Sequence, residues 1–225
     1  MATSRNQPAL FNSAPSTLWC GEVEAWAERA GYGRLIGLDE AGRGPLAGPV
    51  VAAAVCLPDD HSLVGLDDSK RLSERARDAL FPQIQDQALA WAVAVVEPDE
   101  IDQVNILQAS LIAMGRAWTS ATERTPSCRE ALALVDGNQR AHLPGTVEQR
   151  PIVKGDARST HIAAASILAK VTRDRRMLEE HQRWPVYGFA QHKGYPTAMH
   201  REAIRVHGPC PIHRRSFRLP EVATG

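Results

Sequence analysis

Apolar residues gather in five short runs that predict β-strands. The runs cover residues 34–40, 48–58, 89–98, 131–137 and 150–156. A short glycine-rich turn joins the first two runs, so they are close enough to pair as a hairpin. The run at 89–98 is apolar almost throughout, which is typical of a strand covered on both faces.

Helical spacing of apolar residues predicts five helices. They cover residues 18–30, 73–88, 98–121, 159–184 and 197–208. In the third of these, apolar residues recur every three or four positions from Ile101 to Trp118, which predicts one amphipathic helix with a core-facing stripe. Residues 1–17 are polar and contain two prolines, so they are expected to form a flexible N-terminal tail.

The order of these elements predicts an α/β fold. Hairpin and crossover connections together give a mixed central sheet of about five strands, flanked by helices and closed by a C-terminal helical segment. A chain of 225 residues can bury one substantial core, so residues 18–225 are expected to form a single domain. No apolar run approaches the roughly 18 residues that a membrane helix needs, so no membrane partner is expected.

The cysteines and the start of the chain favour the cytoplasm. Cys20, Cys56, Cys128 and Cys210 stand far apart with no CxxC pair, which argues against a zinc knuckle or a disulfide framework and suits a reducing compartment. The first residues lack the compact apolar core of a secretion signal. We therefore expect a cytoplasmic protein.

A formal net charge of zero hides an uneven distribution of charge. Residues 1–139 carry 11 Lys and Arg against 19 Asp and Glu, whereas residues 140–225 carry 15 against 7. A basic surface beside an acidic one suits a nuclease, because the first can hold a polyanion and the second can hold metal ions. Two solvated faces that happen to differ in charge would give the same counts.

Lysine is scarce beside arginine in this chain. Of the 26 basic residues only four are lysines, namely Lys70, Lys154, Lys170 and Lys193. A compact ammonium and a flat guanidinium are not interchangeable where geometry matters. These lysines are therefore candidates for contacts with phosphate or carboxylate groups.

Four acidic residues stand at the ends of predicted strands. Asp39 and Glu40 close the first strand, Asp136 ends a later one, and Asp156 lies where the fifth strand gives way to the longest helix. Ends of neighbouring strands lie close together, and clustered carboxylates repel unless protons or hard cations neutralise them. A helix cap or turn explains any single one of these acids equally well. Four together favour a magnesium or manganese site.

The stretch "DEAGRGPLAGPVV" is glycine-rich but matches neither common nucleotide-binding loop. It has no lysine and leads into a strand, which excludes a phosphate-binding Walker loop. Its glycine spacing also fails the dinucleotide fingerprint, because no helix follows. What remains is a turn in which Gly42 and Gly44 let the backbone approach a ligand closely, with Arg43 between them.

Seven blocks of the chain resemble, in order, those of bacterial ribonuclease HII. They are "GLDEAGRGPLAGPVVAAAV", "DDSKRLS", "EIDQVNILQASLIAM", "LVDGN", "VKGDARSTHIAAASILAKVTRDRRM", "YGFAQHKGYPTAMH" and "HGPCPIHRRSF", which span roughly residues 34–218. The resemblance implies a ribonuclease H-like fold and an endonuclease that cuts the RNA strand of RNA–DNA hybrids. It also implies cleavage on the 5′ side of a single ribonucleotide in duplex DNA, which leaves 3′-hydroxyl and 5′-phosphate ends.

The same resemblance implies the catalytic residues. By matching motif, Asp39, Glu40, Asp136 and Asp156 are the metal-binding and catalytic acids, and they hold two manganese or magnesium ions. We assign Asp39 as the bridging ligand; which acid meets which ion is a hypothesis. Asp174 also matches a family position, but it lies well inside the predicted helix and is expected to be structural.

Recognition of the ribose needs a second set of residues, since only the 2′-hydroxyl distinguishes RNA from DNA at a given site. The resemblance implies that the backbone at Gly42, Arg43 and Gly44 contacts this hydroxyl and that Tyr195 stacks on the neighbouring deoxyribose. Tyr187 is the other candidate for this stacking role, and otherwise it is a packed aromatic residue of the core. Further contacts with the duplex are assigned to Ser69, Lys70, Lys193, Thr160 and either Arg214 or Arg215.

Two other functions remain compatible with the acidic residues. A junction resolvase of the same fold would share the acids without needing a ribose sensor, and a non-catalytic nucleic-acid-binding module would use them to hold a structural ion. The expected partners are RNA–DNA hybrids and ribonucleotide-containing duplex DNA, bound by a monomer. The sequence gives no support for a sliding-clamp partner, since the chain stops soon after "HRRSF".

Overall fold

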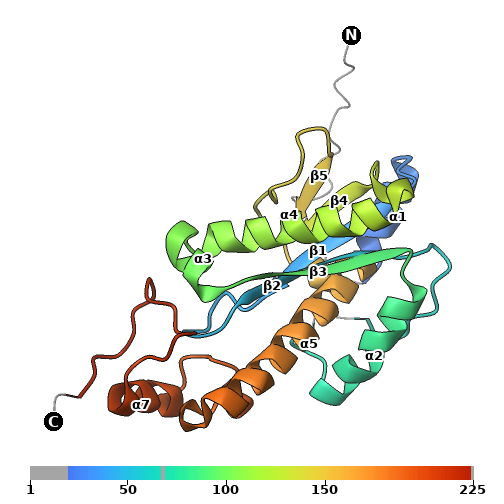
Figure 1. Ribbon diagram of the computed structural model, residues 1–225. Helices are drawn as coiled ribbons and strands as arrows, with labels where there is room; N and C mark the ends of the chain where they lie inside the picture. Colours follow the sequence, from blue (N-terminus) through green and yellow to red (C-terminus); the bar gives the residue numbers. More distant parts are fainter. Residues whose placement is uncertain (1–19, 67–68, 224–225) are drawn as a thin grey trace.

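A five-stranded mixed sheet forms the centre of the molecule in the computed structural model, which describes residues 20–66 and 69–223 (Figure 1). The strand order is β3-β2-β1-β4-β5. The strands are β1 (Leu35–Ala41), β2 (Val50–Cys56), β3 (Ala90–Val96), β4 (Leu132–Asp136) and β5 (Gln149–Ile152). The predicted tail at residues 1–17 lies outside the described residues.

The pairing of the strands confirms the predicted mixture of hairpin and crossover connections. β1 pairs with β2 and β2 with β3 in antiparallel fashion, whereas β4 pairs in parallel with both β1 and β5. Leu38 of β1 lies opposite Val135 of β4. The next residues along these strands, Asp39 and Asp136, are therefore level with each other, at the last residue of β4 and two residues before the end of β1.

Helices cover both faces of the sheet. The α-helices are α1 (Glu22–Arg29), α2 (Glu74–Gln87), α3 (Pro98–Val104), α4 (Ile106–Arg124), α5 (Thr160–Arg183), α6 (Phe189–His192) and α7 (Ala198–His207). Short 3-10 turns η2 (Pro126–Cys128), η3 (Gly155–Ala157) and η4 (Pro185–Tyr187) lie between them. α4 lies on one face, α5 and α2 lie on the other, and α7 lies near the far end of α5 (Figure 1).

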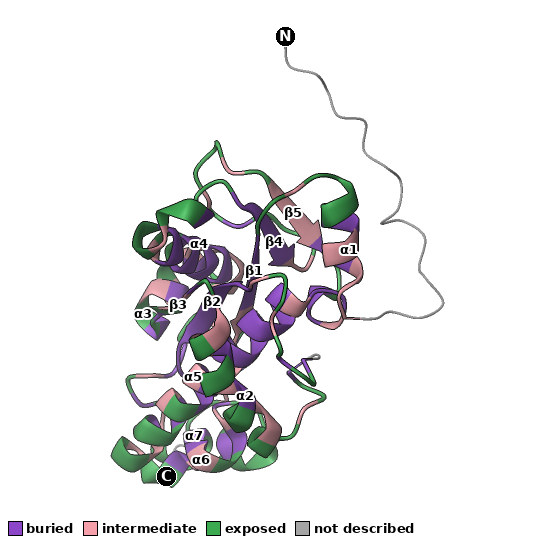
Figure 2. Ribbon diagram, turned by 90° about the vertical axis from the view of Figure 1, so that its right-hand side faces the viewer, coloured by how far each residue is buried: buried purple, intermediate pink, exposed green. Residues whose placement is uncertain are grey.

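Small residues bring α5 unusually close to the sheet. Ala163, Ala164 and Ala165 are wholly buried, and buried residues concentrate in the sheet and in the helix faces turned towards it (Figure 2). A Cβ atom on Gly37 of β1 would lie 2.2 Å from the carbonyl carbon of His161. Since no side chain fits between them, the start of α5 is held directly against β1, two residues before Asp39.

The prediction of one helix over residues 98–121 is wrong in one respect. The helix is broken at Asn105, whose φ of 71° and ψ of 162° separate α3 from α4. The Asn105 side chain accepts hydrogen bonds from the backbone N–H groups of Leu107 and Gln108, at 3.0 and 3.1 Å, and so caps α4. Helical spacing continues across this break, which explains why the spacing alone did not detect it.

The prediction that the strand at 89–98 is covered on both faces is only partly confirmed, because the face towards α4 is mostly buried and the opposite face is only partly covered. β3 is an edge strand, and its buried and partly exposed positions alternate over much of its length. The strand buried at every position is β2, which lies between β3 and β1. β5 is shorter than predicted and ends at Ile152, so Asp156 lies in the turn η3 rather than at the strand end.

The described helices include none that is both long enough and apolar enough to cross a bilayer.

The C-terminal elements pack around a small core of their own. This core combines residues from the glycine-rich turn, the end of α5 and the segment after it: Leu46, Ala47, Met177, Tyr187, Phe189, Ala203, Ile204 and Cys210.

Candidate active site

Asp39 and Asp136 lie side by side on the α5 face of the sheet. Residues at the same register in parallel strands point to the same face, and Gly37, two positions before Asp39, faces α5. The backbone N–H of Glu40 donates to Asp39 Oδ1 at 2.7 Å, and the N–H of Gly155 donates to Asp136 Oδ1 at 2.7 Å. These bonds fix the orientation of both carboxylates.

The turn η3 brings Asp156 to the same place. Lys154 precedes the turn with a φ of 55°, and Gly155 is the first residue of the turn. A Cβ atom on Gly155 would lie 2.5 Å from Ile162 Cδ1 and 3.1 Å from Asp136 Oδ1, so only glycine allows this close approach. Asp156 is buried, and Lys70 Nζ lies 3.8 Å from its Oδ2 atom.

Charge repulsion in this group is visible in the pKa values. Burial raises the pKa of Asp39 well above its usual range, and the negative charges of Asp136, Glu40 and Asp156 raise it further. Burial also raises the pKa of Glu40 and of Asp136, with Arg43 and Lys70 opposing the shift at Glu40. The four predicted acids therefore act on one another electrostatically, and their charges are only partly compensated.

The donor set fits a hard divalent cation. Asp39, Glu40, Asp136 and Asp156 offer only carboxylate oxygens, which magnesium and manganese prefer. In the part of the chain that the structure describes, no three Asp, Glu, His or Cys side chains already form a closed ligand cage. Ion binding at these carboxylates would relieve their repulsion.

The glycine-rich turn follows directly after these acids. Gly42 has a φ of +106°, and a Cβ atom there would lie 2.2 Å from Arg173 Nε. Both facts require glycine at this position. The Arg43 side chain is about half exposed, and its Nη1 lies 3.4 Å from Glu40 Oε1, which links the turn to the acidic group.

Tyr195 lies against this turn. The backbone N–H of Leu46 donates to the carbonyl of Gly194 at 2.9 Å, and a Cβ atom on Gly44 would lie 3.5 Å from Tyr195 Cε1. Tyr195 is 42% exposed, so part of its side chain is available to a ligand. Tyr187, in contrast, is buried and its hydroxyl donates to the carbonyl of Gly208 at 2.7 Å.

Comparison with known proteins decides the family. The model of the family described as Ribonuclease HII matches residues 36–219. A curated ribonuclease HII from Marinomonas sp. is 54% identical over 197 residues, which cover 87% of this chain and 96% of that protein. The chain belongs to the ribonuclease HII family. It is accordingly a hydrolase, an endonuclease of the ribonuclease H class that degrades RNA in RNA–DNA hybrids.

Two solved structures support the ribonuclease H-like fold. The ribonuclease H2 of Pyrococcus horikoshii is 28% identical, with a TM-score of 0.63, and the match covers 82% of this chain and 93% of that one. A ribonuclease HII from Archaeoglobus fulgidus, solved in complex with PCNA, is 25% identical, with a TM-score of 0.65, and the match covers 84% and 98%. A third solved structure, Bst-RNase HIII, is 20% identical with a TM-score of 0.62, and it was determined in complex with Mn2+.

Of the remaining residues predicted from the ribonuclease HII resemblance, Ser69 and Lys70 lie beside the acidic group and the others do not. The Ser69 hydroxyl lies 2.8 Å from that of Ser166 on α5, whereas Thr160 donates to Glu24 at 3.2 Å. Lys70 is exposed, and the ammonium of Lys193 donates to the carbonyl of Ala190. Asp174, expected to be structural, pairs with Lys170 at 2.7 Å.

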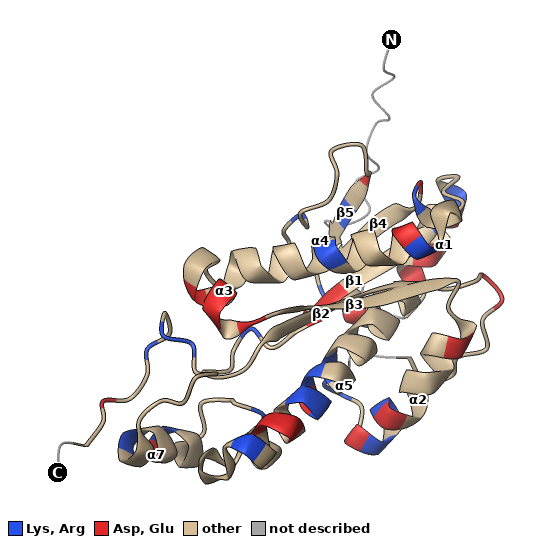
Figure 3. Ribbon diagram, in the orientation of Figure 1, with Lys and Arg blue, Asp and Glu red and all other residues tan. Residues whose placement is uncertain are grey.

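Arg214 and Arg215 were alternatives for contact with the duplex, and their burial separates them. Arg214 is wholly buried, whereas Arg215 is exposed. Only Arg215 is therefore able to meet a duplex from its present position. Basic and acidic residues alternate along the C-terminal half of α5 (Figure 3).

Sequence reasoning missed two residues beside the site. Ser166 donates to the carboxylate of Asp39, which favours its charged form. Arg173 is wholly buried beneath the glycine-rich turn. Arg173 stands in the charged half of α5, where an arginine is usually a surface residue, so no local pattern marks it as buried.

Proposed function

We propose that the protein cleaves RNA–DNA hybrids, and duplex DNA on the 5′ side of a single ribonucleotide, with divalent cations held by Asp39, Glu40, Asp136 and Asp156. One observation carries the proposal: the buried acidic group is continuous with the turn at Gly42–Gly44, which contacts Tyr195. The proposed metal site and the proposed ribose contact thus adjoin along one stretch of backbone. A junction resolvase or a binding module has no need of the second.

The proposed chemistry follows from the placement of the carboxylates. Two divalent ions bound there would hold the scissile phosphate, activate a water molecule and stabilise the departing 3′-oxygen. Asp39, between Glu40 in sequence and Asp136 in the sheet, is our candidate for the ligand shared by both ions. Backbone N–H groups orient Asp39 and Asp136, and Lys70 offsets negative charge near Asp156.

We assign substrate selection to the turn and to Tyr195. Backbone groups of Gly42, Arg43 and Gly44 would contact the 2′-hydroxyl and the adjoining phosphate, while Tyr195 would stack on the next sugar. Backbone donors suit this role because their positions are fixed by the fold, and phosphate contacts alone cannot distinguish RNA from DNA. Ser69, Lys70, Lys193 and Arg215 would contribute to binding of the duplex.

The test uses four substrates with manganese or magnesium: duplex DNA with one ribonucleotide, an RNA–DNA hybrid, all-DNA duplex and a branched DNA junction. We expect cleavage of the first two only, with 3′-hydroxyl and 5′-phosphate ends and complete loss in EDTA. Asp39→Asn should lower the rate about a hundredfold or more, since even indirect supports of metal ligands contribute about 10- to 100-fold. Cleavage of the junction would favour a resolvase, and binding without cleavage would favour a non-catalytic module.

We further propose that the protein works as a monomer in the cytoplasm. Cys56, Cys128 and Cys210 are buried thiols that form no disulfide within the described residues, which suits a reducing compartment. Light scattering on the purified protein tests the monomer, and a dimer mass would refute it.

A further inference from the structure

Two wholly buried arginines lie beneath the glycine-rich turn. Arg173 comes from α5 and Arg214 from the chain after α7, and both are 0% exposed. Among the residues that the structure describes, no carboxylate lies within 4.0 Å of either guanidinium. Their hydrogen bonds go to backbone carbonyl groups instead.

Arg214 holds the turn at both of its ends. Its Nη2 donates to the carbonyl of Gly42 at 2.6 Å and its Nη1 to that of Arg43 at 3.1 Å. On the other side, its Nε donates to the carbonyl of Gly48 at 2.9 Å, and Nη2 also reaches that of Pro49 at 3.2 Å. One side chain therefore fixes the distance between the first and the last residues of the turn.

Arg173 joins the turn to the segment that carries Tyr195. Its Nε donates to the carbonyl of Pro49 at 3.0 Å and its Nη2 to that of Ala47 at 3.2 Å. Its Nη1 donates to the carbonyl of Lys193 at 3.0 Å, and its guanidinium carbon lies 6.0 Å from the centre of the Tyr195 ring. The two surfaces assigned to substrate selection are thus held by one group.

Burial of these charges is costly for the fold. Burial lowers the pKa of Arg173 to about 10 and that of Arg214 to about 9, and the charge of Arg173 contributes to the second shift. An apolar pair of similar volume would avoid this cost. Charged hydrogen bonds to fixed carbonyls offset it, and they also impose one conformation on the turn.

The direction of these bonds exposes the opposite edge of each peptide group. The C=O and N–H of a trans peptide point in opposite directions. With the carbonyls of Gly42 and Arg43 turned inwards to Arg214, the N–H groups of Arg43 and Gly44 point away from it. These are the groups that would meet the ribose.

We propose that Arg173 and Arg214 are positioning residues that set the selectivity for ribonucleotides by holding the turn at Gly42–Gly48 and Tyr195 in their binding geometry. This inference rests on the proposed function. It predicts that weakening either arginine reduces binding of a ribonucleotide-containing duplex much more than binding of all-DNA duplex.

The experiment measures equilibrium binding in the non-cleaving Asp136→Asn background, with calcium present. Arg173→Lys and Arg214→Lys keep a positive charge but lose the planar fork of donors. We expect the Kd for duplex DNA with one ribonucleotide to rise about tenfold, and the Kd for all-DNA duplex to change less than twofold. Arg175→Lys is the matched control, because Arg175 is an exposed residue of the same helix that pairs with Asp78.

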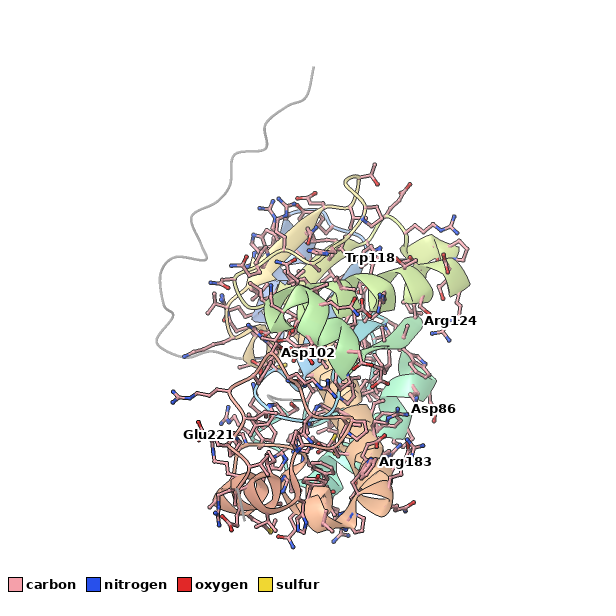
Figure 4. All side chains as sticks on the ribbon, turned by 60° about the vertical axis from the view of Figure 1, so that its left-hand side comes forward. Asp86, Asp102, Trp118, Arg124, Arg183 and Glu221 are labelled. Atoms are coloured by element: carbon pink, nitrogen blue, oxygen red, sulfur yellow. The ribbon has the colours of Figure 1, made fainter. Side chains whose placement is uncertain are left out.

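A further variant keeps the test independent of the buried positions. The carboxylate of Asp102 on α3 accepts hydrogen bonds from the N–H groups of Arg215 and Ser216, at 2.8 and 2.9 Å, and from the Ser216 hydroxyl at 2.6 Å (Figure 4). Asp102→Ala should release the segment that carries Arg214 without exposing a buried charge. We expect the Kd for duplex DNA with one ribonucleotide to rise about threefold, with little change in the Kd for all-DNA duplex.

The outcomes separate this inference from the proposed function. If the Asp136→Asn background itself shows no preference for the ribonucleotide, the proposed function fails. Suppose that the background shows the preference and the lysine variants fold. The positioning role is then wrong if these variants keep the preference, or if their Kd rises equally for both duplexes. If both lysine variants fail to fold, an unchanged preference in Asp102→Ala overturns the role, and a selective loss supports it.

Discussion

Among single residues, Asp39 shows most directly the conflict between stability and catalysis. Its carboxylate is buried beside three other acids, and burial together with their charges raises its pKa well above the usual range. A carboxyl group with a raised pKa in the folded state contributes less stability as the pH rises through that pKa. Without metal, and at any pH above the ordinary pKa of an aspartate, Asp39 therefore destabilises the fold.

We expect Asp39→Asn to stabilise the metal-free protein while it abolishes activity. The amide removes the repelling charge and keeps an oxygen for the N–H of Glu40, so the free energy of unfolding at pH 8 in EDTA should rise by about 0.5 to 2 kcal/mol. Urea unfolding measures this. Asp174→Asn is the control, because it breaks the 2.7 Å pair with Lys170 and should lower stability. If the free energy of unfolding fell in both variants, the ionised carboxylate of Asp39 would not be what destabilises the metal-free protein.

At the same scale, the sequence predicted the acids better than the residues that support them. Asp39, Asp136 and their neighbours could be found because a strand end is a local feature and strand ends converge in any sheet. Arg173 was missed, and Arg214 was named only as an alternative for duplex contact, because their partners are carbonyl groups up to 172 residues away in the chain. The environment of such a side chain exists only after folding.

Among the elements, β1 and α5 depend on a contact that only glycine allows. A Cβ atom on Gly37 would overlap the backbone of His161 and Ile162, at 2.2 and 2.3 Å. Gly37→Ala should therefore push α5 away from the sheet, cost about 3 kcal/mol or more and reduce metal-dependent cleavage. Gly33→Ala is the matched control, since nothing lies within 4 Å of its added Cβ atom. Similar unfolding midpoints for both variants would refute this.

The ends of helices and strands are the features that the apolar pattern of the sequence predicts least well. The helical spacing from Ile101 onwards continues through Asn105, so the break there depends on a backbone angle and a side-chain cap that spacing does not record. The apolar run of β3 predicted a covered strand, because an edge strand and a central strand can share a composition. Strand order, which decides between them, arises from long-range pairing.

For the whole molecule, three neutral histidines tie the C-terminal segment together. His200 Nδ1 donates to the carbonyl of Tyr195 at 3.0 Å and its Nε2 lies 3.1 Å from His213 Nε2, while His192 Nε2 donates to the carbonyl of Tyr187 at 2.7 Å. Burial lowers the pKa of His192, and lowers those of His200 and His213 to about 4. The segment that presents Tyr195 is therefore held by groups that function only when uncharged.

The sign of the resulting pH dependence follows from these values. The unfolded chain takes up protons below about pH 6.5, whereas the folded His200 and His213 resist protonation until about pH 4, so stability falls as the pH drops between these limits. From pH 7 to pH 5 we expect a loss of about 2 kcal/mol for each of these two histidines. Urea unfolding at both pH values measures it.

The variant His200→Gln tests whether these histidines cause the loss of stability between pH 7 and pH 5. His200→Gln can keep a donor for Tyr195 and an acceptor for His213 but cannot become charged, so the loss between pH 7 and pH 5 should shrink by about half. His207→Gln changes an exposed residue and should leave the pH dependence unaltered. An equal loss in the parent and in His200→Gln would place the acid sensitivity elsewhere.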